Sequence, residues 1–165
     1  MENSSNGTIT ARQVTKSGIH RSVLQELVKD GELYRYGRGI YSHDTALYLL
    51  GYSDRTPAKY TMTFPKGYNT PSLKLENIIV KRVVPDNYSF GTVEIDSPCG
   101  NLVKVYGVER SLCDIVRGSG SDIQVVKEAM KRYAASKEKD IHRLMKYAEQ
   151  LRVRPKILHY IEVLL

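Results

Sequence analysis

The sequence predicts an α+β protein in which a small N-terminal helix and hairpin module precedes a larger domain of strands and helices. Three observations predict this class. A helical pattern and then a basic, glycine-rich hairpin pattern occupy residues 10–41. Runs of β-branched and aromatic residues, separated by proline and glycine turns, occupy residues 60–106. From residue 108 onward, the apolar residues recur with helical spacing.

The N-terminal module is predicted to begin with two short helices. Residues 18–31 form the second helix, because its apolar residues make one core-facing stripe: Ile19, Val23, Leu24, Leu27 and Val28. Gly18 suits the turn before this helix and Gly31 suits its end, since glycine tolerates a positive φ. Residues 10–16 supply the partner helix, with Thr10 as its N-cap. The pair predicts a helix-turn-helix.

A wing is predicted directly after the second helix. Leu33, Tyr34 and Tyr36 favour a strand, residues 37–39 turn the chain, and residues 40–41 return it. DNA readers need Arg and Lys for phosphates, and Arg, Gln or Ser for base edges. The expected base-reading residues are Arg21, Ser22 and Gln25, with His20 near the helix start. The expected backbone contacts are Lys16, Arg35 and Arg38. The alternative is a small module whose charges are merely solvated.

Composition limits the function classes. The net charge of +7 indicates a polyanionic partner. Basic residues exceed acidic ones by two in residues 1–41, by none in residues 42–100 and by five in residues 101–165. Cys99 and Cys113 lie in unrelated contexts without clustered histidines, so no metal and no cofactor is expected. No leader or long apolar run is present, which favours a reducing cytoplasm over secretion or a membrane.

The larger domain is predicted to start with a helix at Ser42. Four strands and four helices should follow that first helix of residues 42–53: strands 60–64, 78–84, 91–95 and 102–106, then helices 108–116, 122–135, 139–151 and 155–165. The short gap between the last two strands predicts an antiparallel hairpin.

Several ordered motifs resemble one known family. The segments are GELYRYGRGIY, SHDTALYLLGYSDRTPAKYTMTFPKGYN, ERSLCDIVR, DIQVVKEAMKRY and RLMKYAEQLRV. Together they resemble the AbiEi family, the antitoxin and transcriptional regulator of type IV abortive-infection toxin–antitoxin systems in phage resistance. The resemblance implies a winged helix-turn-helix in residues 1–41 that binds inverted repeats in its own promoter. It also implies that residues 42–165 assist repression and counter a nucleotidyltransferase-like toxin.

The chain departs from the family pattern in two places. The N-terminal module lacks the family's usual first helix. Tyr41 directly precedes Ser42, without the usual segment between the two domains.

A second basic surface is a candidate in the C-terminal half. Its residues recur along successive predicted helices: Lys127, Lys131, Lys137, Lys139, Arg143 and Lys146. Arg152, Arg154 and Lys156 are further candidates for the same surface. One interpretation is a surface that lies along DNA or meets an acidic toxin or a nucleotide. The other is a solvated face with ordinary helical charge pairing.

Two clusters suggest catalysis less strongly. Ser42, His43 and Asp44 are consecutive, whereas a catalytic triad needs converging side chains, so Ser42 or Asp44 is expected to cap the helix. Glu94, Asp96 and Lys104 loosely match the acidic-plus-lysine pattern of metal-dependent nucleases. The leading interpretation is a non-enzymatic DNA-binding repressor and antitoxin. The alternatives are a nucleic-acid-processing enzyme with a nuclease-like C-terminal domain and a protein–protein adaptor.

Overall fold

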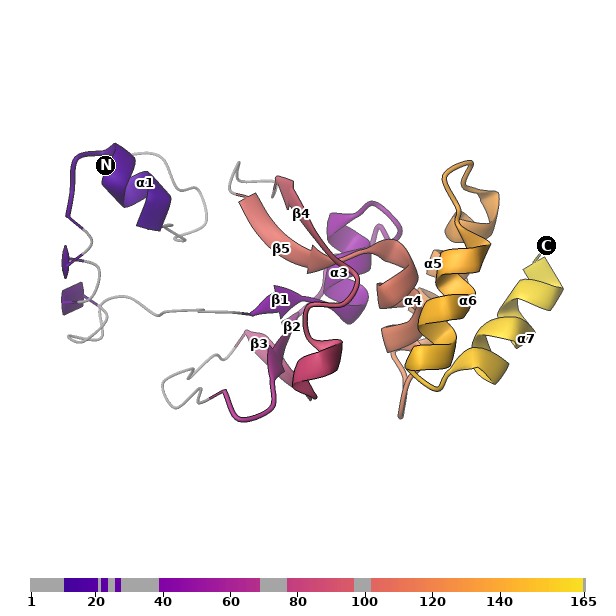
Figure 1. The fold of residues 1–165 in the computed structure, drawn as a ribbon. Helices are drawn as coiled ribbons and strands as arrows, with labels where there is room; N and C mark the ends of the chain where they lie inside the picture. Colours follow the sequence, from indigo (N-terminus) through magenta and orange to yellow (C-terminus); the bar gives the residue numbers. More distant parts are fainter. Residues whose placement is uncertain are drawn as a thin grey trace.

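The computed structural model of the chain describes residues 11–20, 22–23, 26–27, 39–68, 77–96 and 102–164 (Figure 1). The elements in these ranges are α1 (Ala11–Lys16), β1 (Ile40–Tyr41), α3 (His43–Leu49), β2 (Tyr60–Pro65), β3 (Ile78–Val83), the 3-10 helix η1 (Pro85–Asn87), β4 (Thr92–Asp96), β5 (Leu102–Tyr106), α4 (Val108–Ile115), α5 (Ile123–Ala135), α6 (Ile141–Gln150) and α7 (Arg154–Leu164). The mixed α/β domain with a helical C-terminal half is therefore confirmed.

The strands form one five-stranded sheet in the order β3-β2-β1-β5-β4. The β4–β5 pair is antiparallel, with Thr92 opposite Tyr106, which confirms the predicted hairpin. The β1–β2 pair is also antiparallel, whereas β2–β3 and β1–β5 are parallel. The sheet is thus mixed, and its outer strands β3 and β4 expose most of their side chains.

The central strand β1 is only two residues long. Ile40 pairs with Thr63, and Tyr41 pairs with both Met62 and Val105. The sequence predicts these two residues as the returning strand of a wing. The first strand of that hairpin lies outside the described residues, and the structure pairs Ile40 and Tyr41 with β2 and β5. Ser42 follows β1 directly and begins the turn into α3, so no linker is needed where the sequence shows none.

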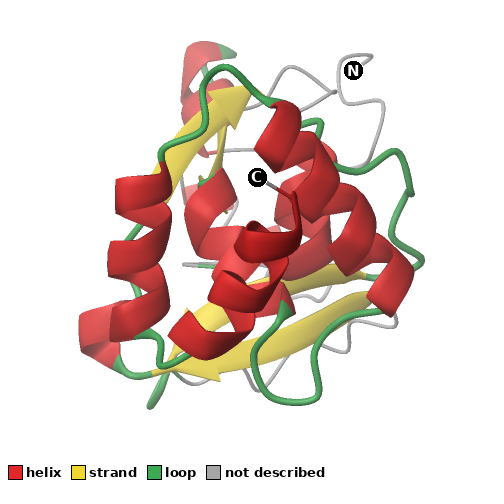
Figure 2. Ribbon diagram, turned by 90° about the vertical axis from the view of Figure 1, so that its right-hand side faces the viewer, coloured by secondary structure: helices red, strands yellow, loops and turns green. Residues whose placement is uncertain are grey.

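Helices α4 to α7 stack on one side of the sheet, where they lie in front of the strands in Figure 2. Helix α4 is central, because every one of its residues from Glu109 to Ile115 is buried. Its apolar residues join those of α5, α6 and α7 in one core cluster. The buried residues of α5 follow the helical spacing of its apolar residues: Val125, Val126, Ala129, Met130 and Tyr133. No helix in the described ranges is long and apolar enough to cross a membrane.

Helix ends differ from the predictions by a few residues. Helix α3 spans His43–Leu49 rather than residues 42–53, and Gly51 follows it with a φ of +78°. Ser42 occupies the N-cap position of α3, but its side chain makes no capping bond, so the predicted capping role for Ser42 is wrong. Asp122 caps α5, because its side chain accepts a hydrogen bond from the Gln124 amide at 2.7 Å.

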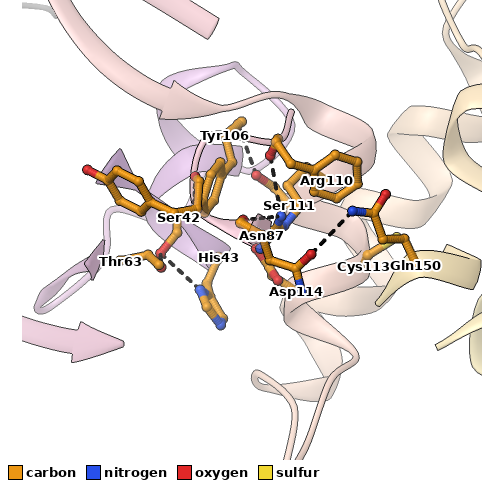
Figure 3. Close-up of polar contacts among 12 residues, drawn as sticks. Ser42, His43, Thr63, Asn87, Tyr106, Arg110, Ser111, Cys113, Asp114 and Gln150 are labelled. Carbon is orange, nitrogen blue, oxygen red and sulfur yellow. Dashed lines mark hydrogen bonds and ion pairs between the residues drawn. The ribbon is translucent and has the colours of Figure 1, made fainter. Parts of the chain in front are cut away.

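Two charged residues of α4 are buried beside two aromatic rings, and we call this set the arginine cluster: Arg110, Asp114, Tyr106 and Phe90. The Arg110 side chain is fully buried, and its Nε donates to Asp114 Oδ2 at 3.0 Å. Its Nη1 donates to the Asn87 carbonyl at 3.0 Å. The guanidinium also lies 4.4 Å from the Tyr106 ring centroid and 5.0 Å from that of Phe90. The cluster joins α4 to the chain around η1 (Figure 3).

Candidate nucleic-acid interface

The first half of the predicted DNA-reading module is described in part. Helix α1 ends at Lys16, two residues before Gly18, whose φ is +76°. The Gly18 amide donates to the Thr15 carbonyl and the Ile19 amide to the Val14 carbonyl, both at 3.1 Å. This is the pattern of a helix that stops at a left-handed glycine, as the sequence predicts. Thr10, the predicted cap of this helix, lies outside the described residues.

The second predicted helix is described at four positions only. Ser22, Val23, Glu26 and Leu27 are helical. Ile19 and Val23, which the sequence assigns to a core-facing stripe, are 37% and 39% exposed. Leu24, Val28, Gly31 and the wing up to residue 38 lie outside the described residues, so the winged helix-turn-helix stays a prediction.

Three of the expected DNA contacts fall in the described ranges, and all three are exposed: Lys16, His20 and Ser22. The Ser22 amide donates to His20 Nδ1 at 3.3 Å, and the Ser22 hydroxyl lies 2.9 Å from the same nitrogen. Because Nδ1 accepts from the amide, the proton of a neutral imidazole lies on Nε2. His20 therefore stabilises the helix start and keeps a donor for other groups. Arg21, Gln25, Arg35 and Arg38 lie outside the described residues.

The residues of the second basic surface are all exposed: Lys127, Lys131, Lys137, Lys139, Arg143 and Lys146. Their surroundings differ. The Arg143 guanidinium binds Asp140 at 2.8 Å, and hydrogen bonds from the Arg143 backbone and side chain lower the pKa of Asp140. The Lys139 ammonium donates to the Ser136 carbonyl at 3.3 Å. Lys127, Lys131, Lys137 and Lys146 form no ion pair within the described chain, and so these four are the stronger candidates.

The consecutive Ser42, His43 and Asp44 do not form a catalytic triad. Ser42 is fully buried, and its hydroxyl accepts a hydrogen bond from the Thr63 hydroxyl at 2.9 Å. It also lies 3.0 Å from His43 Nδ1, so two neighbouring side chains do converge (Figure 3). Asp44 instead accepts a bond from the Ser121 hydroxyl at 2.7 Å. Within the described residues no carboxylate is hydrogen-bonded to His43, so Ser42, His43 and Asp44 lack the arrangement of a catalytic triad.

His43 lines a pocket of about 160 Å³ between α3, β3 and the α4–α5 loop. The other lining residues are Asp44, Thr61, Ile79, Lys81, Arg117, Ser119, Gly120 and Ser121. We call this the His43 pocket. Burial lowers the pKa of His43, an effect that Asp114 opposes and Lys81 reinforces. Sequence reasoning does not find Lys81, Arg117 or Ser121, because it assigns residues 118–120 only to a helix end and Lys81 only to a strand.

The possible nuclease residues lie on the β4–β5 hairpin. Glu94 is directly opposite Lys104, and Asp96 is opposite Leu102. Glu94, Asp96 and Lys104 are all exposed. Within the described residues, no three His, Cys, Asp or Glu side chains lie close enough together to hold a metal ion. The hairpin thus offers a solvated charge pair.

Comparison with known proteins identifies the N-terminal segment. Residues 2–42 match the family model described as "Transcriptional regulator, AbiEi antitoxin". For residues 2–42 this confirms the family resemblance, and the matched segment is about a quarter of the chain. No curated protein matches the chain. The match supports a transcriptional regulator of the antitoxin class.

Proposed function

We propose that this protein is a DNA-binding transcriptional repressor and antitoxin that regulates its own toxin–antitoxin operon. In this proposal, residues 1–41 read inverted repeats in the promoter, and residues 42–165 assist repression and counter a nucleotidyltransferase-like toxin in type IV abortive infection. The observation that carries the proposal is the family match over residues 2–42, which covers the whole proposed reader.

The described geometry supports a DNA-reading role for this segment. Lys16 ends α1, and His20 and Ser22 lie exposed just beyond the glycine turn. An exposed hydroxyl and an exposed imidazole beside a basic helix end suit phosphate and base-edge contacts. Lys127, Lys131 and Lys146 add exposed, unpaired positive charge in the second proposed domain.

Footprinting of the full chain on the DNA upstream of its own gene tests the proposal. We expect protection of two inverted repeats. Gln25→Ala should weaken binding to those repeats by roughly 1–3 kcal/mol while leaving random duplex unaffected, because a base contact carries sequence information. Lys16→Ala should weaken both DNAs alike and reduce the salt slope by about one. Lys59→Ala is the control, since Lys59 is exposed in the turn before β2.

Two results would contradict the proposed function. Equal losses of affinity for operator and random DNA in Gln25→Ala would contradict the proposal that this helix reads bases. Cleavage of promoter DNA with Mg²⁺, abolished by Glu94→Ala, would favour a nucleic-acid-processing enzyme instead.

Antitoxin activity is tested separately by co-expression with the neighbouring toxin gene. The Gln25→Ala variant should lose promoter repression and still rescue growth, because the proposed reader and the proposed antitoxin domain are different segments. Simultaneous loss of both activities in this variant, with unchanged thermal stability, would contradict the proposed division at residue 41.

A further inference from the structure

The His43 pocket collects polar groups from segments that are far apart in the chain. His43 and Asp44 come from α3, Lys81 from β3, and Arg117 and Ser121 from the α4–α5 loop. Its volume of about 160 Å³ corresponds to about five water molecules. A pocket of this size admits a small polar group.

The backbone at His43 is unusual for a residue with a side chain. Its φ is 55°, in the left-handed region that favours glycine. Such conformations are concentrated at ligand-binding sites, where the surrounding structure holds them in place. Here the neighbouring Ser42 hydroxyl contacts the imidazole at 3.0 Å. The structure thus keeps an imidazole where a glycine would fit with less strain.

A hydrogen-bond chain fixes which imidazole nitrogen faces the pocket. The Thr63 hydroxyl donates to Ser42 Oγ, and the Ser42 hydroxyl keeps a proton that it can donate to His43 Nδ1, 3.0 Å away. The neutral ring then carries its proton on Nε2. In Figure 3 the second ring nitrogen points away from Ser42 and Thr63. His43 therefore presents an N–H donor to the pocket.

The charges around the pocket leave an excess of positive donors. Lys81 and Arg117 are exposed and make no ion pair with a carboxylate of the described chain. Asp44 is already bound by the Ser121 hydroxyl at 2.7 Å, and Asp114 by Arg110 at 3.0 Å. The two nearby carboxylates thus have partners, whereas the two cations at the rim have none in the described ranges.

We propose that the His43 pocket binds the phosphoryl group of a small phosphorylated compound. Three residues from different parts of the chain line it and carry hydrogen-bond donors: His43 from α3, Lys81 from β3 and Arg117 from the α4–α5 loop. A tetrahedral oxyanion offers each of them an acceptor oxygen, and a charged acceptor makes these hydrogen bonds strong. The site is separate from the proposed DNA reader, so this inference does not rest on the proposed function.

Calorimetric titration of the full chain at constant ionic strength tests the site. The probes are orthophosphate, 5′-AMP and adenosine, with chloride as the matched salt. We expect the two phosphates to bind and adenosine to give no heat. Tighter binding of 5′-AMP would identify a phosphate monoester as the ligand class, whereas equal binding would identify free phosphate. No binding of either phosphate above the chloride background would overturn the proposal.

Variants at the rim assign the binding to this pocket. Arg117→Gln and Lys81→Gln should each weaken phosphate binding about tenfold, as expected for loss of a charged hydrogen bond. Lys146→Gln is the control, because Lys146 is an exposed cation on α6 and lies outside the pocket. Equal affinity for the control and both rim variants would overturn the proposal.

An NMR measurement on the unchanged chain tests whether the His43 imidazole contacts the phosphate. Phosphate should shift the ring signals of His43 and leave those of His142, on the exposed face of α6, unchanged. The His43→Asn variant retains a residue that tolerates the left-handed conformation, and it should fold and lose phosphate affinity. Unshifted His43 signals under saturating phosphate would contradict the proposed donor.

Discussion

The arginine cluster is centred on α4 and the His43 pocket is lined in part by the loop that follows α4, but the two differ in how their charges are satisfied. Arg110 is fully buried, and Asp114, two carbonyls and two aromatic rings surround it. His43 has one bonded ring nitrogen and lies beside two exposed cations. A paired, buried charge contributes to structure, whereas unpaired donors around an open pocket are left for a ligand.

The pairing within the arginine cluster is close to complete. Nη2 of Arg110 is one of two buried side-chain atoms without a hydrogen-bond partner in the described chain. The ring faces of Tyr106 and Phe90 offset part of that loss. Such a cluster tolerates little change, because removing one partner leaves a buried charge uncompensated.

The largest expected effect is therefore the Asp114→Asn substitution. It removes the carboxylate that faces Arg110 and should destabilise the protein by about 3–5 kcal/mol, as measured by urea unfolding. Asp96→Asn on the exposed strand β4 is the matched control and should change stability by less than about 0.5 kcal/mol. A similarly small change in the free energy of unfolding of both variants would contradict the view that the arginine cluster stabilises the fold.

A smaller effect is expected for Thr63→Val, which keeps the shape of the side chain. The substitution removes the hydroxyl that donates to Ser42, in a site where both residues are buried. We expect a loss of about 1 kcal/mol in thermal unfolding, together with mixed imidazole tautomers of His43 in NMR spectra. Thr56→Val, at an exposed position, is the control. Retention of a single His43 tautomer in Thr63→Val would argue against the hydrogen-bond chain.

The smallest expected effect is on the pH dependence of stability. The pKa of His43 is lower in the folded chain than its ordinary 6.5, because burial disfavours the charged ring. The unfolded chain therefore binds a proton first as the pH falls below 6.5, and the stability from the neutral ring is lost as the pH falls through the lowered value. One such group gives a slope of at most about 1.4 kcal/mol per pH unit.

His43→Asn should flatten this part of the stability profile between about pH 7 and 5 relative to the unchanged chain. His142→Asn is the control, because His142 is exposed and should leave the profile unchanged. An identical slope in the unchanged chain and in His43→Asn would show that burial does not act on this ring.

Much of the fold follows from local patterns. The apolar spacing in α5 predicts its buried face residue by residue, and the runs of β-branched residues predict β2 to β5 within one residue at most ends. The parallel pairing of β2 with β3 does not follow, because residues 60 and 78 meet through long-range packing. The sequence predicts residues 40–41 as a strand but not its partners β2 and β5, since two residues carry no periodicity that indicates which strands they pair with.

The candidate sites were predictable to different degrees. Exposed basic residues such as Lys127 and Lys131 follow from helical spacing. The His43 pocket does not, because Asp44 and Ser121 are 77 positions apart and meet only in the folded chain. The left-handed backbone of His43 has no counterpart in the sequence, since a helix start is expected there.

The place of β1 has a mechanical consequence. The two residues that join β2 to β5 follow Gly39, where an added Cβ would lie 2.5 Å from the Met62 methyl and 2.8 Å from Phe64 Cζ. The chain thus enters the sheet at its centre, through a narrow passage against the core. A force applied to the N-terminal segment loads the middle of the sheet in shear, across both neighbouring ladders at once, instead of peeling away an outer strand.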